Sequence, residues 1–249
     1  EMCIRDRAYK VHPYRWPTIG LSVDDIKNAS HEDIKSFFAQ HYAVNNLILC
    51  VSGHIEFEKA VALTERWFVD FAPANIPVRN LPQEPVQTEQ RFMSVKREVP
   101  QNVLTMMYHM CGRCDADYQV CDMLSDVLSN GMSSRFYRNV LVKSGLFTEL
   151  DASVSGTYDP GLFIVRARLA DGVSFDKAKE AIDAELADFV RNGASAYEIE
   201  KCANKYESTR LFDMITYEKK GVKLCQYELL GDAADINKEV GKYRCITQD

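Results

Sequence analysis

A proline-rich stretch at residues 72–90 constrains the folding of this chain more than any other feature. It carries four prolines, with Asn and Gln residues between them. Closely spaced prolines hold the backbone extended and remove hydrogen-bond donors, so they favour a stiff connection over a packed element. The sequence therefore predicts one domain in residues 8–72, a linker at 73–90 and a second domain in residues 91–249.

The first seven residues carry four charged side chains. This segment is too short and too charged to be a signal peptide. We expect residues 1–7 to be a non-native leader in front of the first domain. Any targeting signal would then lie outside this sequence, which leaves the compartment of a soluble protein, cytoplasmic or periplasmic, undetermined.

The first domain has the pattern helix, strand, helix. Ser30 and Asp33 form a capping box, and apolar residues then recur at helical spacing up to Tyr42. The continuous apolar run at 47–51 is typical of a strand buried on both faces. A second amphipathic helix is predicted at 57–71.

The second domain alternates strands and helices in blocks of two. Residues 163–169 show this clearly, because apolar side chains alternate with Ile164, Arg166 and Arg168. The predicted elements are strands at 91–99 and 102–110, helices at about 120–129 and 133–142, strands at 150–154 and 163–169, and a helix at 174–192. A capping box of Ser195 and Glu198 then opens a long helical stretch to about 230, which Gly221 breaks or kinks. This order predicts an α+β fold with helices on one face of a sheet.

The composition supports a globular core and argues against some partners. Hydrophobic residues make up 46% of the 249 residues, which is enough to bury a core. The net charge of -6 and the pI of about 5.5 argue against nucleic acid as a partner. No apolar run approaches the ~20 residues that span a bilayer. Most of the eight cysteines are expected to be reduced thiols.

The order of several short motifs is more specific than any one of them. These motifs are His12-Pro13-Tyr14, the stretch from His41 to Asn46, the stretch from Leu124 to Gly131, Ser133 to Tyr137, Asp159 to Phe163, Glu198 to Asn204, and Glu228 to Asp232. From Ala8 onward, their order and spacing resemble the M16 family of insulinase/pitrilysin-type zinc metallopeptidases, especially its compact bacterial members.

The resemblance implies an architecture that this chain fills only in part. M16 peptidases resemble a clamshell, in which each half has two related α+β domains and the halves enclose a peptide substrate. The chain would supply the end of a first domain, a linker and most of a second domain, so both of its ends are expected to be cut. The apolar side chains of Trp67, Phe68 and Phe71 would then lack part of their cover, which predicts marginal stability or self-association.

The zinc site of the family cannot be carried over onto these residues. The family holds zinc with an inverted His-x-x-Glu-His motif and a downstream Glu, and zinc lowers the pKa of its bound water to ~7. The five histidines here, at positions 12, 31, 41, 54 and 109, include no pair with that spacing. The resemblance thus implies zinc in the complete parent protein, no metal bound by this chain and no peptide cleavage by this chain alone.

Four residues are candidate site residues. Arg135 and Tyr137 follow the serine-rich motif and either line a peptide cleft or pack locally. Cys111 and Cys114 form a C-x-x-C motif that suits thiol-redox chemistry, although an ordinary turn that holds two thiols explains it as well. The Arg and Tyr that hold substrate from the opposing half of M16 enzymes correspond by position to Leu141 and Thr148, so that pair is absent.

Three hypotheses about function follow. The first is a fragment of an M16-like zinc metallopeptidase that supplies scaffold and chamber wall, with peptides as substrates and a second M16-like half as partner. The second is a non-catalytic M16-like partner or assembly subunit. The third is a thiol-redox module at Cys111 and Cys114.

Overall fold

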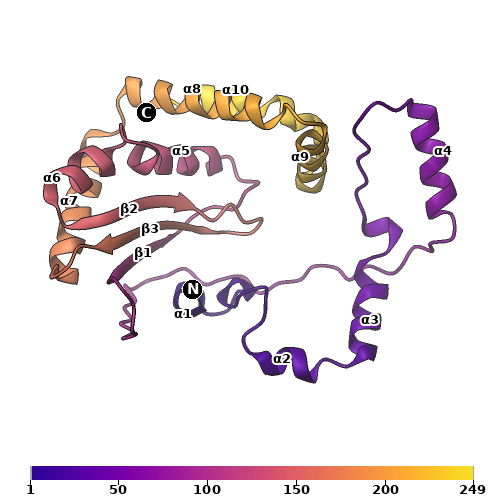
Figure 1. Cartoon of the computed structure of the whole chain (residues 1–249), viewed down its shortest axis with the longest axis horizontal. Coiled ribbons are helices and arrows are strands. Elements are labelled where there is room, and N and C mark those ends of the chain that lie inside the picture. Colours follow the sequence, from indigo (N-terminus) through magenta and orange to yellow (C-terminus); the bar gives the residue numbers. More distant parts are fainter. Residues whose placement is uncertain (1, 249) are drawn as a thin grey trace. The chain divides into compact units, whose positions relative to one another are not determined.

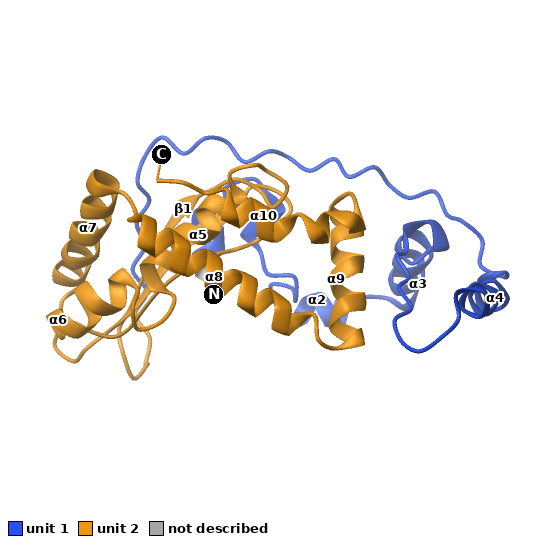
Figure 2. Cartoon of the chain, turned by 90° about the horizontal axis from the view of Figure 1, so that it is seen from above, with its two compact units in different colours: residues 1–95 blue, residues 96–249 orange. Residues whose placement is uncertain are grey.

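The computed structural model describes residues 2–248, and the chain divides into two compact units (Figure 2). Unit 1 is Glu1–Val95 and unit 2 is Lys96–Asp249. Around the boundary between them, residues 69–102 form neither helix nor strand. The sequence-based assignment of residues 1–7, 8–72, 73–90 and 91–249 stays a prediction.

Unit 2 is built on an antiparallel sheet with the order β1-β3-β2 (Figure 1). The strands are β1 (Val103–His109), β2 (Phe147–Val154) and β3 (Leu162–Leu169). Central β3 pairs with both neighbours in a defined register, with Val165 opposite Met106 on one side and Ala152 on the other. This arrangement confirms the α+β class and the alternating pattern of residues 163–169.

The core of unit 2 lies between this sheet and its helices. Phe163, Val165, Ala167 and Leu169 of β3 are buried, whereas Arg166 and Arg168 are exposed. Helices α5 (Tyr118–Ser129) and α7 (Phe175–Asn192) and the π-helix Phe136–Leu141 cover the apolar face, and the core includes Leu128, Phe136 and Ile182.

A second apolar cluster joins α5 to the helices on its far side. Met123 and Val127 of α5 pack with Cys202 of α8 (Ala196–Asp213) and with Tyr243 of α10 (Glu239–Arg244). Figure 1 shows the resulting layers, with α5 between the sheet and the pair α8 and α10. Because α5 carries apolar residues towards both layers, it is the central helix of unit 2.

The remaining elements of unit 2 lie around these layers. They are α6 (Val142–Ser144), α9 (Tyr217–Leu230) and the 3-10 helix Ala233–Asn237. Gly145 ends α6 in the left-handed region, with φ of 64°. A glycine adopts this conformation at no steric cost, so the chain can turn directly into β2.

Unit 1 contains helices but no strand among its described residues. Its helices are α1 (Met2–Ala8), α2 (Val23–Asn28), α3 (His31–His41) and α4 (Phe57–Phe68), with 3-10 turns at Pro13–Arg15 and Val44–Asn46. Its few buried side chains are Ala43 and a group at Ala8, Tyr9 and His12. Beside that group, the Glu84 carboxylate accepts hydrogen bonds from the backbone N–H groups of residues 10, 11 and 12.

Three sequence predictions about elements are wrong. The run at 47–51 is extended but forms no strand, and its side chains are about half exposed. Residues 91–99 also form no strand, so β1 lacks the predicted hairpin partner. A strand needs a neighbouring strand, and the sheet of the described residues, with the order β1-β3-β2, includes neither segment.

The third wrong prediction is that Gly221 breaks or kinks the helical stretch from 195 to about 230. The chain leaves the helix at Met214, and the Thr216 side chain accepts a hydrogen bond from the backbone N–H of Lys219 to start α9. Gly221 lies inside α9 and is buried, so it causes no break. A threonine that caps the next helix, rather than a glycine, separates the two helices.

Candidate functional site

Arg135 joins three helical segments of unit 2. Its Nε donates to Glu198 Oε1 at 2.8 Å, and its Nη2 donates to Glu198 Oε2 at 2.9 Å and to the Gly193 carbonyl at 2.8 Å. The guanidinium also lies over the Phe189 ring, 4.8 Å from its centroid. The side chain is 14% exposed, so these contacts use most of its donors for packing.

The electrostatics of Glu198 reflect this pairing. The hydrogen bond from Arg135, together with those from Ser195, outweighs burial and lowers the pKa of Glu198 to about 2. Tyr137 lies half-buried two residues after Arg135. The role of Arg135 and Tyr137 in substrate binding stays a prediction, and the geometry of Arg135 favours local packing.

The C-x-x-C motif lies in the loop between β1 and α5. This loop is held closely, because the Arg113 N–H donates to the Thr157 carbonyl at 2.8 Å and a Cβ on Gly112 would lie 2.4 Å from the Tyr158 carbonyl oxygen. Burial, with a smaller contribution from the neighbouring Cys121, raises the pKa of Cys111 to about 11. Reactive thiols have lowered pKa values, so Cys111 remains protonated at neutral pH. The redox role of Cys111 and Cys114 stays a prediction.

Metal-ligating side chains do not converge in the part of the chain that the structure describes. Within residues 2–248, no three His, Cys, Asp or Glu residues lie together in a way that could hold a metal ion. A zinc site needs three or four such ligands. The described residues therefore do not fit the zinc ion that the family resemblance implies for the parent.

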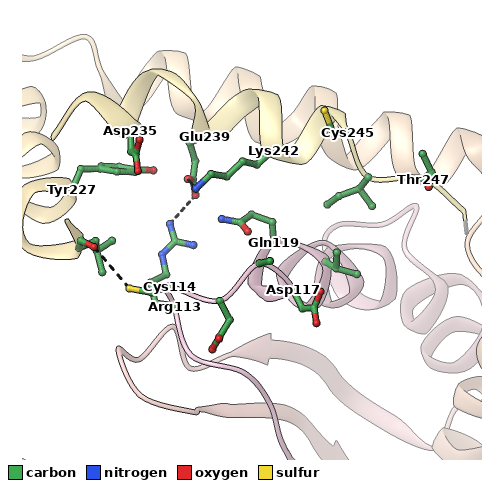
Figure 3. A pocket seen from close by; sticks show the side chains of 15 residues that line it. Arg113, Cys114, Asp117, Gln119, Tyr227, Asp235, Glu239, Lys242, Cys245 and Thr247 are labelled. Atoms are coloured by element: carbon green, nitrogen blue, oxygen red, sulfur yellow. Dashed lines mark hydrogen bonds and ion pairs between the residues drawn. The ribbon is translucent and has the colours of Figure 1, made fainter. Parts of the chain in front are cut away.

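One cavity of unit 2 was not predicted from the sequence. It has a volume of about 840 Å³ and lies between the loop after β1, the start of α5 and the C-terminal helices α9 and α10 (Figure 3). Its polar lining includes Arg113, Gln119, Asp235, Glu239 and Lys242. No sequence motif connects these residues, because positions 113–119 and 235–242 come together only through tertiary packing.

A buried ion pair forms one end of this pocket. Arg113 Nη2 lies 2.8 Å from Glu239 Oε1, and the Glu239 side chain is 1% exposed. Burial is the largest influence and disfavours the charged form of Arg113, but the attraction and hydrogen bond of Glu239, together with the nearby Tyr118 and Tyr243, outweigh it and raise the pKa of Arg113. The guanidinium also lies 4.3 Å from the centroid of the Tyr118 ring. Glu239 and the Tyr118 ring thus both hold the Arg113 guanidinium in place, and the ion pair forms part of the pocket wall.

A helix that crosses a bilayer must be long and predominantly apolar. None of the described helices combines the length and the apolar character needed to cross a bilayer.

Comparisons with known proteins place the fold. Over 199 residues, the chain is 26% identical to the zinc protease PqqE of Helicobacter pylori. This match covers 78% of this chain and 44% of that protein. Over 240 residues, the chain is 24% identical to an uncharacterized zinc protease of Streptomyces coelicolor. This match covers 94% of this chain and 52% of that protein. The chain therefore spans about half the length of these relatives.

Solved structures show the same architecture. A protease from Helicobacter pylori superposes with a TM-score of 0.90 at 22% identity, over 99% of this chain and 60% of that one. The peptidase M16 inactive domain from Pseudomonas fluorescens gives 0.81 at 18% identity, over 99% of this chain and 58% of that one. At the sequence level, a family model described as the peptidase M16 inactive domain matches residues 28–206. Since that match covers well over half of the 249 residues, the chain belongs to the peptidase M16 inactive-domain family.

Proposed function

We propose that this chain is a non-catalytic part of an M16-type zinc peptidase. It supplies scaffold and chamber wall, and it docks against the parts of the parent that carry zinc. Peptides are the substrates of that parent, and a second M16-like half is its partner. The zinc protease names of the relatives support zinc in the parent.

The exposed apolar surface of unit 1 carries the proposal. Phe37 and Phe38 of α3 and Phe57 and Trp67 of α4 are all more than half exposed, although both helices are amphipathic. The extended run at 47–51 exposes further apolar side chains. Large apolar side chains that a folded chain leaves exposed in such number indicate an interaction site. We infer that further strands or helices of an M16 domain cover it.

The experiment adds an upstream segment to the chain. The chain alone, supplied with zinc, is expected to give no chelator-sensitive hydrolysis of quenched fluorescent peptides. The chain expressed with its upstream coding segment is expected to hydrolyse them, provided that the segment carries His-x-x-Glu-His. The matched control replaces the Glu of that motif with Gln. Chelator-sensitive turnover by the chain alone would overturn the proposal.

The second candidate function is a partner subunit that never carried zinc. The same apolar surface favours it, because a subunit that docks against an active half also needs an interface. An upstream segment without the His-x-x-Glu-His motif, together with binding to a separate zinc-bearing chain, would support this candidate over the first.

A further inference from the structure

Gln119 directs a side-chain amide into the pocket of unit 2. Gln119, the second residue of α5, is 6% exposed, and its side-chain amide makes no hydrogen bond to the described residues. Figure 3 shows this amide pointing into the space in front of Arg113 and Glu239. Neither amide atom is among the fully buried unpaired atoms, so both face the open pocket and can offer a donor and an acceptor to a bound molecule.

Lys242 supplies a cation at the same end of the pocket. Its Nζ lies 3.9 Å from Glu239 Oε2, which is too far for a hydrogen bond. Glu239 is already bound by Arg113 at 2.8 Å. The Lys242 ammonium therefore keeps its donors, and Figure 3 shows it beside Glu239, facing the same space as Gln119.

The acidic residues around the pocket are mostly engaged elsewhere. Asp235 pairs with Lys238 at 2.6 Å, and Asp115 accepts the Gly112 N–H at 2.6 Å. Asp117 points away from the space between Gln119 and Glu239 in Figure 3. The side chains that face this space thus offer more donors than acceptors.

We propose that this pocket binds the C-terminal end of a peptide. The terminal carboxylate binds the Lys242 ammonium, and the last peptide bond pairs with the Gln119 amide, which can donate and accept at once. Val120 and Leu230, which also line the pocket, contact the last side chain. The volume of about 840 Å³ lies within the range of ligand pockets.

This inference rests on the proposed function for its class of ligand. Hydrolysis of a peptide bond creates a new C-terminal carboxylate, so an M16-type parent would produce molecules of this kind within its own chamber. The pocket would then hold a product or a peptide about to be shortened. Neither zinc nor the rest of the parent takes part in the binding itself.

The test measures binding of peptides to the whole chain in the absence of zinc. Two pools of fluorescein-labelled pentapeptides are compared by fluorescence anisotropy, one with free C-termini and one with C-terminal amides. The free acids are expected to bind about tenfold more tightly, because the amides lose a charge-assisted hydrogen bond. In Lys242→Met this difference is expected to disappear. Lys177→Met, a change at an exposed lysine of α7 outside the pocket, is expected to keep it.

A second variant separates binding from folding. Gln119→Leu has a similar shape and removes the unpaired amide, so it is expected to weaken binding of both pools about fivefold without lowering the urea midpoint. A purely structural glutamine would lower that midpoint instead.

Three results would overturn the inference. They are no binding of either pool at millimolar peptide, equal binding of acids and amides, and equally tight binding of amidated peptides that carry an internal Glu. The last result would mean that the pocket reads acidic side chains rather than C-termini. Because no hydrolysis is measured, these results are independent of the cleavage experiment above.

Discussion

Helices α3 and α5 are both amphipathic, but their apolar side chains end in different surroundings. In α5, Met123 and Val127 are 3% and 2% exposed, whereas Phe37 and Phe38 of α3 are 57% and 58% exposed. The helix in unit 2 has a sheet on one side and α8 and α10 on the other. The helix in unit 1 has no strand to cover among the described residues.

The comparison shows which part of folding is local. Both helices form where the pattern of caps and apolar residues predicts them, so local sequence is sufficient to place them. Burial is a property of the partner surface, and most helical stability comes from such packing. Unit 2 therefore has a cooperative core, whereas the helices of unit 1 leave their apolar faces exposed.

The largest expected effect comes from matched truncations of a phenylalanine in each unit. Phe136 is fully buried in the core of unit 2, so Phe136→Ala should lower its free energy of unfolding by about 4 kcal/mol through lost packing and a cavity. Phe38→Ala removes an exposed ring that stacks on Tyr42 in unit 1. It should change the free energy of unfolding of unit 1 by less than about 0.5 kcal/mol. Urea unfolding followed by far-UV circular dichroism measures both.

The two tryptophans, Trp16 and Trp67, both lie in unit 1 and give a separate signal for that unit. If tryptophan fluorescence showed a sharp urea transition that Phe38→Ala shifted by several kcal/mol, unit 1 would have a core of its own and the contrast between the units would be wrong.

An intermediate effect is expected at the ion pair between Arg135, at the start of the π-helix, and Glu198 of α8. Arg135→Met leaves Glu198 partly buried without its partner, which should cost about 2 kcal/mol at pH 7. The folded-state pKa of Glu198, about 2, lies below its ordinary value of 4.5. The pair thus stabilises the folded state above pH 4.5, and that stabilisation is lost as the pH falls towards 2. The difference between wild type and variant should shrink over this window.

The matched control for this variant is Arg168→Met. Arg168 lies 2.7 Å from Glu149, but both side chains are more than half exposed, so the pair should contribute no more than about 0.5 kcal/mol. Urea midpoints measured at intervals between pH 7 and pH 3 test both variants. A pH-independent cost of Arg135→Met would show that Arg135 acts through packing on Phe189 rather than through Glu198.

Local signals in the sequence were sufficient for much of unit 2. The alternation in residues 163–169 correctly identified the buried and exposed faces of β3. The capping boxes at Ser30 and Ser195 correctly marked the starts of α3 and α8. The prediction of a strand at 47–51 was wrong because an apolar run favours burial but does not supply the neighbouring strand.

The pocket could not be predicted, because its chemistry depends on contacts between distant positions. Gln119 is the second residue of an amphipathic helix, and its position gives no signal of a site. Glu239 lies in a charged stretch of the kind that indicates solvated surface. Only packing of α10 beside α5 buries both of them. Arg135 shows the opposite case, since its partner Glu198 belongs to a capping box that the sequence did identify.

The smallest expected effect compares the two capping boxes, which are nearly identical in geometry. Ser30 accepts from the backbone N–H of Asp33 at 3.1 Å, and Ser195 accepts from that of Glu198 at 3.3 Å. Removal of such a cap costs about 1 kcal/mol of local helix stability. Ser195→Ala should therefore lower the urea stability of unit 2 by about that amount. In Ser30→Ala the same local cost should appear only as faster hydrogen exchange at the start of α3, since nothing in the described part of unit 1 couples that helix to a core. Equal shifts of the urea midpoint in the two variants would show that α3 is already part of a cooperative fold.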